Sequence, residues 1–186
     1  MTVHAPRRLF TVEEFHRMAD GGVFAEDDRL ELIAGDIVEM TPIGSRHAAC
    51  VDRLARELQR SIPATTIVRV QSPIVLGRDS EPQPDIAVLR YRTDFYRDRH
   101  PGPGDVLLVI EVADTSIAFD RGTKLPLYAR AGIPELWIVD LAASAVEIWR
   151  QPVREACCET ERISGSGRLT SSSLPGFDVA VAEVIG

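Results

Sequence analysis

Cysteine is scarce in this chain of 186 residues, which contains three, two of them adjacent at Cys157 and Cys158. Neighbouring cysteines rarely pair with each other because the ring that would close is strained. The sequence has no CxxC pattern and no cluster of cysteine with histidine, which excludes the common structural zinc sites. We therefore expect reduced thiols and no disulfide scaffold.

Long apolar segments are also lacking. No stretch approaches the roughly 18 to 20 apolar residues that a membrane-spanning helix requires, so no membrane association is expected. The first residues, MTVHAPRRLFTVEEF, do not contain the apolar segment of a secretory signal peptide. With 45% hydrophobic and 26% charged residues the composition is that of a globular protein, which we expect in the cytoplasm.

Positive charge is in deficit, because 28 acidic residues outnumber 21 basic ones and give a formal net charge of −7. Proteins that bind nucleic acid tightly and without sequence preference usually carry a basic excess that contacts phosphates. Any role on DNA must therefore rest on a local basic face or on metal ions. The sequence also has no glycine-rich loop between a strand and a helix, so it does not predict a P-loop or dinucleotide site.

The order of secondary structure predicts a single domain over residues 1–186, with a core at about 45–140. Helical spacing and capping signals alternate with segments rich in valine and isoleucine, and a hairpin is expected near the N-terminus. Helices are expected at 11–22, 45–62 and 123–131, and strands within 29–40, 65–76, 85–91, 105–113, 135–141, 145–150 and the end of 169–185. The strand, helix and strand from 107 to 139 suit a parallel crossover, which makes the fold class mixed α/β with a central mixed sheet.

Two carboxylates interrupt the apolar strands. Glu111 lies inside the segment LLVIEVA, whose continuous apolar character is typical of a strand covered on both faces. An ionised carboxylate there would cost several kcal/mol unless it had a cation, a metal or a proton beside it. Asp85 follows Pro84 at the start of a predicted strand. Together on neighbouring strands, Asp85 and Glu111 would offer two hard oxygen ligands, which suit Mg²⁺ or Mn²⁺. Each also has a plainer interpretation. Glu111 could be a strand-end residue that reaches solvent, and Asp85 could be a turn residue.

Lysine is almost absent, since Lys124 is the single lysine beside twenty arginines. It falls in the first turn of the helix predicted after the Glu111 strand, from which it could return to the end of that strand. An ammonium there could position or deprotonate a water and stabilise developing charge. The alternative is an ordinary surface lysine.

These residues carry a resemblance to a known family. Pro84-Asp85, Glu111 and Lys124 resemble the PD-(D/E)-x-K nuclease superfamily. More narrowly, the segments RLELIAGDIVEMTP, PDIAVL, VIEVAD, DRGTKLPLYARAGIPELWIVDL and SSSLPGFDVAVAEV resemble the bacterial Uma-two family of restriction-endonuclease-like proteins. The resemblance covers nearly the whole chain.

The resemblance implies a restriction-endonuclease-like fold and a metal-dependent endonuclease that hydrolyses DNA phosphodiester bonds. Asp85, Glu111 and the backbone carbonyl of Val112 would bind Mg²⁺ or Mn²⁺, and Lys124 would assist the attacking water. The sequence departs from the superfamily at Ala113, two residues after the acid, where the lysine normally stands. Lys124 resembles the relocated lysine that some branches carry on the following helix.

Four further residues could support the site. Glu31 matches a glutamate of the family motif and could complete the acidic site, or it could be an exposed strand residue. Gln71 could face the same pocket or pair with backbone. His47 opens the apolar stripe of its helix, where a half-buried structural histidine is the plainer interpretation. Asp120 could orient Lys124 or cap its loop.

Two other functions remain open. A catalytically inactive binding or oligomerisation module is favoured by the net charge and by Ala113. A glycosidase could use Asp85 and Glu111 as acid and base, but it leaves Lys124 without a role. If the chain cuts duplex DNA, a homodimer would supply one active site for each strand.

Overall fold

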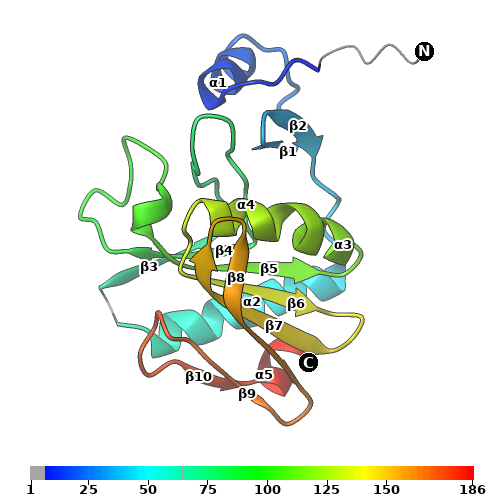
Figure 1. Ribbon diagram of the computed structural model, residues 1–186, viewed down its shortest axis with the longest axis vertical. Helices are drawn as coiled ribbons and strands as arrows, with labels where there is room; N and C mark the ends of the chain where they lie inside the picture. Colours follow the sequence, from blue (N-terminus) through cyan, green and yellow to red (C-terminus); the bar gives the residue numbers. More distant parts are fainter. Residues whose placement is uncertain (1–6, 64) are drawn as a thin grey trace.

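A computed structural model describes residues 7–63 and 65–186; residues 1–6 of the predicted domain lie outside the described part. Its centre is a six-stranded mixed sheet in the order β3-β4-β5-β6-β7-β8 (Figure 1). The strands are β3 (Thr66–Val70), β4 (Ile86–Arg90), β5 (Val106–Ala113), β6 (Glu135–Asp140), β7 (Ala145–Val153) and β8 (Ala156–Ser164). β5 and β6 are parallel and all other neighbours are antiparallel, which confirms the predicted mixed sheet and its crossover.

Helices cover both faces of this sheet. The long helix α2 (Ser45–Ser61) packs on one face together with a small two-stranded sheet, β9 (Arg168–Thr170) and β10 (Asp178–Ala180), and with α5 (Val181–Ile185). On the other face lies a helical segment formed by α3 (Ile117–Phe119), a π-helical turn η2 (Asp120–Lys124) and α4 (Leu125–Arg130). A 3₁₀ turn, η1 (Pro103–Asp105), leads into β5.

The central strand β5 is buried on both faces, as its apolar sequence predicts. Leu108, Ile110 and Val112 belong to the core beneath α2, whereas Val109 and Ala113 belong to the core beneath α4. Because side chains alternate along a strand, Glu111 points to the α4 side.

An N-terminal unit stands beyond one edge of these layers (Figure 1). Helix α1 (Val12–Asp20) begins with a capping box, in which Thr11 accepts from the Glu14 N–H and the Glu14 carboxylate accepts from the Thr11 N–H. The hairpin of β1 (Leu30–Ile33) and β2 (Asp36–Glu39) follows it. A bridge between Leu32 and Glu81 attaches the hairpin to the loop that precedes β4.

Several boundaries differ from those expected. The helix predicted at 123–131 begins earlier, at Ile117, and contains the π-helical turn. The strand expected over 65–76 ends at Val70, because Gln71 adopts a positive φ of 45°. The strand expected at the end of 169–185 is present only as the short β10, after which the chain ends in the helix α5, and β8 was not expected at all. Two strands of the sheet, β7 and β8, therefore come after the core predicted at 45–140.

Within the described residues, no helix is both long and apolar enough to cross a membrane.

Candidate active site

The site forms where strands β4 and β5 separate. Their last paired residues are Ile86 and Ile110, and the residue before Asp85 is a proline, which has no N–H for a ladder. Backbone N–H groups that have no ladder partner here contact carboxylate oxygens instead. The Asp85 N–H lies 3.4 Å from Glu111 Oε2, and the Val112 N–H donates to Asp85 Oδ2 at 2.8 Å. Two acids from neighbouring strands are thereby held against each other.

Glu111 is 4% exposed and has two partners from the opposite helical segment. The Tyr128 hydroxyl donates to Glu111 Oε1 at 2.6 Å, and Lys124 Nζ lies 3.3 Å from the same oxygen. Burial raises the pKa of Glu111 to about 8, and the charge of Lys124 offsets only part of this effect. Burial also raises the pKa of Tyr128 well above its usual value, so this hydroxyl stays a donor. The carboxylate of Glu111 is thus incompletely compensated by the protein.

Lys124 reaches Glu111 from the π-helical turn. The Leu125 N–H bonds to the carbonyl of Asp120, five residues back, and single π turns of this kind are frequent at functional sites. Lys124 Nζ lies between Glu31 Oε2 at 3.2 Å and Glu111 Oε1 at 3.3 Å. Burial alone would lower the pKa of Lys124, but the charges of Glu111 and Glu31 outweigh it and raise the pKa. Lys124 is therefore a charged donor and not a base.

Asp85 is held from the α2 side. His47 Nε2 bonds to Asp85 Oδ2 at 2.9 Å, and Gln71 Nε2 makes a longer contact of 3.4 Å with Oδ1. The hydrogen bond to Asp85 raises the pKa of His47, against the opposing effects of burial and of the Arg29 charge. The other ring nitrogen, Nδ1, is buried and has no partner among the described residues. The Gln71 N–H donates to the Asp85 carbonyl, so Gln71 both pairs with backbone and faces the pocket.

Glu31 and Asp120 complete the surroundings of Lys124. Glu31 comes from β1 of the hairpin and accepts from the Gln83 N–H at 3.1 Å. Asp120, at the start of the π-helical turn, accepts from the Ser116 hydroxyl at 2.6 Å, and burial raises its pKa.

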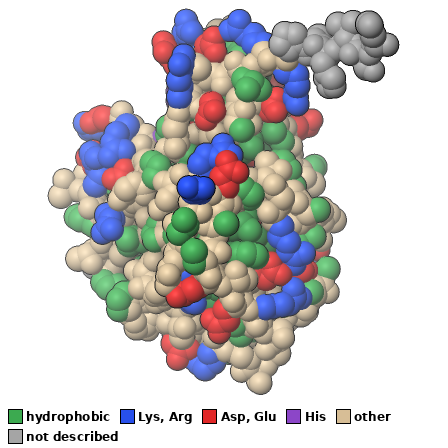
Figure 2. Space-filling model, in the orientation of Figure 1, with side chains coloured by type: hydrophobic (Ala, Val, Ile, Leu, Met, Phe, Trp, Pro, Cys, Tyr) green, Lys and Arg blue, Asp and Glu red, His purple; other side chains and the backbone are tan. Residues whose placement is uncertain are grey.

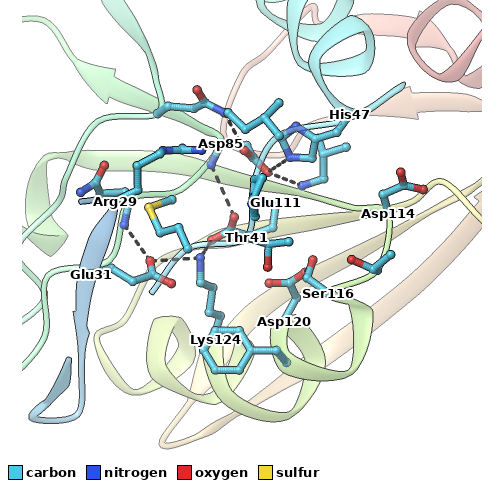
Figure 3. A pocket seen from close by; sticks show the side chains of 18 of the residues that line it. Arg29, Glu31, Thr41, His47, Asp85, Glu111, Asp114, Ser116, Asp120 and Lys124 are labelled. Carbon is cyan, nitrogen blue, oxygen red and sulfur yellow. Dashed lines mark hydrogen bonds and ion pairs between the residues drawn. The ribbon is translucent and has the colours of Figure 1, made fainter. Parts of the chain in front are cut away.

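Apart from Tyr128, the side chains that contact Glu111, Asp85 and Lys124 line one pocket of about 640 Å³, which Figure 3 shows from close by. The structure thus brings together every predicted site residue, namely Asp85, Glu111, Val112, Lys124, Glu31, Gln71, His47 and Asp120. Tyr128 and Ser116 were missed, because a tyrosine in an apolar helix and a serine in a loop carry no distinguishing signal. Arg29 was missed as well, being one of twenty arginines.

The two acids fit a divalent cation that keeps most of its waters. Asp85 Oδ2 and Glu111 Oε1 accept short hydrogen bonds, whereas Asp85 Oδ1 and Glu111 Oε2 each have a single contact of 3.4 Å. Two hard oxygens with unused acceptor capacity therefore face the pocket, and Mg²⁺ is commonly bound by one or two carboxylates together with substrate phosphates. A group of three or more His, Cys, Asp or Glu ligands is not found among the described residues.

Comparison with known proteins identifies the family and the fold of the chain. The chain matches the model of the Uma2 family, described as "Putative restriction endonuclease", over residues 12–182. It is similar to the crystal structure of a "putative nuclease belonging to DUF820" from Anabaena variabilis ATCC 29413, with a TM-score of 0.71 and 14% sequence identity. The similarity covers 95% of this chain and 97% of that one. At this identity it shows the fold. No curated protein matches the chain.

The central mixed sheet flanked by helices, which the sequence predicts, is therefore shared with that crystal structure. Because the family model spans most of the sequence, the chain belongs to the Uma2 family of restriction-endonuclease-like proteins.

Proposed function

We propose that this protein is a divalent-metal-dependent endonuclease that hydrolyses DNA phosphodiester bonds in the pocket around Asp85 and Glu111. One observation carries the proposal: two acids from separating strands meet the single lysine of the chain, with Lys124 Nζ 3.3 Å from Glu111 Oε1. Mg²⁺ or Mn²⁺ is the proposed cofactor, with Asp85, Glu111 and the carbonyl of Val112 as its protein ligands.

Each neighbouring side chain then has a role. His47 and Tyr128 hold one oxygen each of Asp85 and Glu111, and the other oxygens keep only a single contact of 3.4 Å each. Glu31 and Asp120 keep Lys124 charged, so that it donates to the attacking water or to the phosphate as negative charge develops there. A divalent cation at Asp85 Oδ1 and Glu111 Oε2 would favour deprotonation of the water and offset the charge of the phosphate.

The absence of a lysine at position 113, where alanine stands, is compatible with the proposed role of Lys124. Ala113 is buried in the core beneath α4, so a lysine there would have to displace apolar side chains. Lys124 supplies an ammonium beside Glu111 from the helical segment instead. We further propose that the protein acts in the cytoplasm, where its three free cysteines stay reduced.

Cleavage of supercoiled plasmid in Mg²⁺ tests the proposal. Wild type is expected to nick or linearise the plasmid, and EDTA to stop it. Asp85→Asn and Glu111→Gln should each lower the rate by about 100-fold or more, as loss of a transition-state-stabilising group does. Asp52→Asn, which removes an exposed carboxylate of α2 outside the pocket, is the matched control. Cleavage that persists unchanged in Asp85→Asn would exclude this site, and an inert wild type would favour a binding module.

A further inference from the structure

The pocket has an excess of negative charge that a phosphodiester substrate must overcome. Six carboxylates line it, Glu31, Glu39, Asp85, Glu111, Asp114 and Asp120, against two permanent cations, Arg29 and Lys124. A phosphate anion entering this pocket is repelled unless a cation contacts it directly. One divalent ion shared with Asp85 and Glu111 offsets part of this charge.

Lys124 is poorly suited to be that direct contact. It is 6% exposed, and both Glu31 and Glu111 lie within 3.3 Å of its ammonium. Glu31 and Glu111 take two of the three N–H donors of this buried ammonium, so at most one donor remains for a phosphate.

Arg29 is placed differently. It directly precedes β1, and because side chains alternate along a strand it shares a side with Glu31, beside which it lies in Figure 3. Its carbonyl accepts from the Met40 N–H at 2.8 Å, so its backbone is fixed by the hairpin. Its guanidinium forms no ion pair or hydrogen bond within residues 7–63 and 65–186. Most arginines close to an acidic side chain form an ion pair with it. Arg29 is half-buried, and all the N–H donors of its guanidinium remain available.

We infer that Arg29 is the substrate-positioning residue of the pocket, and that its guanidinium binds a phosphate oxygen of the DNA backbone. The planar guanidinium matches a phosphate with two parallel hydrogen bonds, which a lysine cannot reproduce. The inference deepens the proposed function and rests on it for the identity of the phosphate as that of DNA. It also gives the N-terminal hairpin a function, since the hairpin carries both Glu31 and Arg29 to the sheet.

Duplex binding tests the inference. A fluorescein-labelled double-stranded oligonucleotide is titrated with protein in Ca²⁺, a hard cation that takes the same type of oxygen ligand, and its integrity is checked afterwards. Arg29→Ala should weaken binding about 10-fold and reduce the slope of log Kd against log salt by about one. Arg29→Lys should fall between Arg29→Ala and wild type. Arg17→Ala, which removes an exposed arginine of α1 outside the pocket, should stay within about twofold of wild type.

Calorimetric titration of Mn²⁺ into the same proteins separates the two proposals. Arg29→Ala is expected to bind Mn²⁺ as wild type does, because Arg29 does not hold the ligands. If duplex affinity and salt slope are unchanged in Arg29→Ala, or if wild type does not bind the duplex, the inference about Arg29 is overturned. If wild type binds no Mn²⁺ but binds the duplex through Arg29, the nuclease proposal fails and the phosphate contact stands.

Discussion

Lys124 stabilises the folded protein, in addition to its proposed role in the reaction. Glu31 is 3% exposed and Glu111 is 4% exposed, and without a cation both would be buried carboxylates facing each other's charge. The ammonium between them is what makes their burial tolerable. A residue of this kind cannot be judged from activity alone, because removing it changes folding too.

Lys124→Met is therefore expected to lower the free energy of unfolding by about 3 to 5 kcal/mol, the range for removing one partner of a buried ion pair. Urea denaturation followed by circular dichroism measures the loss. Adding Glu31→Gln to this variant should recover part of the stability, because one buried charge is removed, without recovering plasmid cleavage. Lys124→Met as stable as wild type would contradict the account.

Tyr128 tests the surroundings of Glu111 from the other side. Tyr128→Phe removes the 2.6 Å hydrogen bond to Glu111 Oε1 without changing the packing of the ring. Because an intramolecular hydrogen bond contributes about 0.5 to 1.5 kcal/mol, a loss of stability in this range is expected. Tyr91→Phe, at an exposed tyrosine, serves as the control and should have no measurable effect. Equal midpoints for both variants would argue against a buried, hydrogen-bonded Glu111.

Individual site residues could be predicted where they broke an apolar pattern. Glu111 interrupts a strand buried on both faces, and Lys124 is the only lysine, so both stand out. Tyr128 and Arg29 do not, since the first looks like core and the second like surface. Their roles follow from distances that only the folded chain defines.

At the scale of elements, the separation of β4 from β5 and the π-helical turn together create the site. The separation frees the Asp85 and Val112 N–H groups for carboxylates, and the turn sets Lys124 opposite them. A π turn forms when a backbone N–H bonds to the carbonyl five residues back instead of four. No particular residue type is required for this, so the sequence does not predict it. β8 escaped prediction because most of it is exposed and has no alternation of burial. The segment 178–185 alternates like a strand, but only Asp178–Ala180 forms one, because the Glu183 carboxylate accepts from the Ala180 N–H and caps the helix α5.

Another buried acid, Glu135, lies at the start of β6, at the opposite end of this strand from Asp140. It connects β6 to the C-terminal segment of the chain. Its carboxylate is fully buried and accepts from Trp137 Nε1 at 2.8 Å, from the Ser171 hydroxyl at 2.8 Å and from the Ser173 N–H at 3.0 Å. Burial alone would raise the pKa of Glu135, but these hydrogen bonds outweigh it and lower the pKa.

Glu135→Gln is expected to lower the free energy of unfolding by about 2 to 3 kcal/mol at neutral pH, since the donors lose a charged acceptor. A folded-state pKa below the unfolded one gives stability that is present above the unfolded pKa and lost as pH falls through the folded one. The difference between wild type and variant should therefore shrink with acidification. Urea melts across a pH series measure it, and a difference that does not change with pH would contradict the assignment.

At the scale of the whole molecule, charge restricts how DNA can be held. On the face that Figure 2 shows, arginines and acidic residues are interspersed over the described part of the chain. With a net charge of −7, the proposed affinity for DNA is expected to come from the pocket and its cations rather than from a broad basic surface.

The homodimer expected from the sequence belongs to this scale. One compact chain offers one active site, and a symmetric pair would present one to each strand of a duplex. Light scattering coupled to size exclusion should give twice the mass of a single chain, and the plasmid products should include linear DNA at early times. A monomeric mass would contradict the dimer and predict nicking alone.

Asp85 and Glu111 are proposed to form a divalent-metal centre, and calorimetric titration of Mn²⁺ at neutral pH measures this binding. It requires no knowledge of the substrate sequence. Wild type and the Asp52→Asn control are expected to bind Mn²⁺, whereas Asp85→Asn and Glu111→Ala should bind it at least 10-fold more weakly, since each loses one of two carboxylate ligands. Equal binding by all four proteins would place the metal elsewhere and contradict the account.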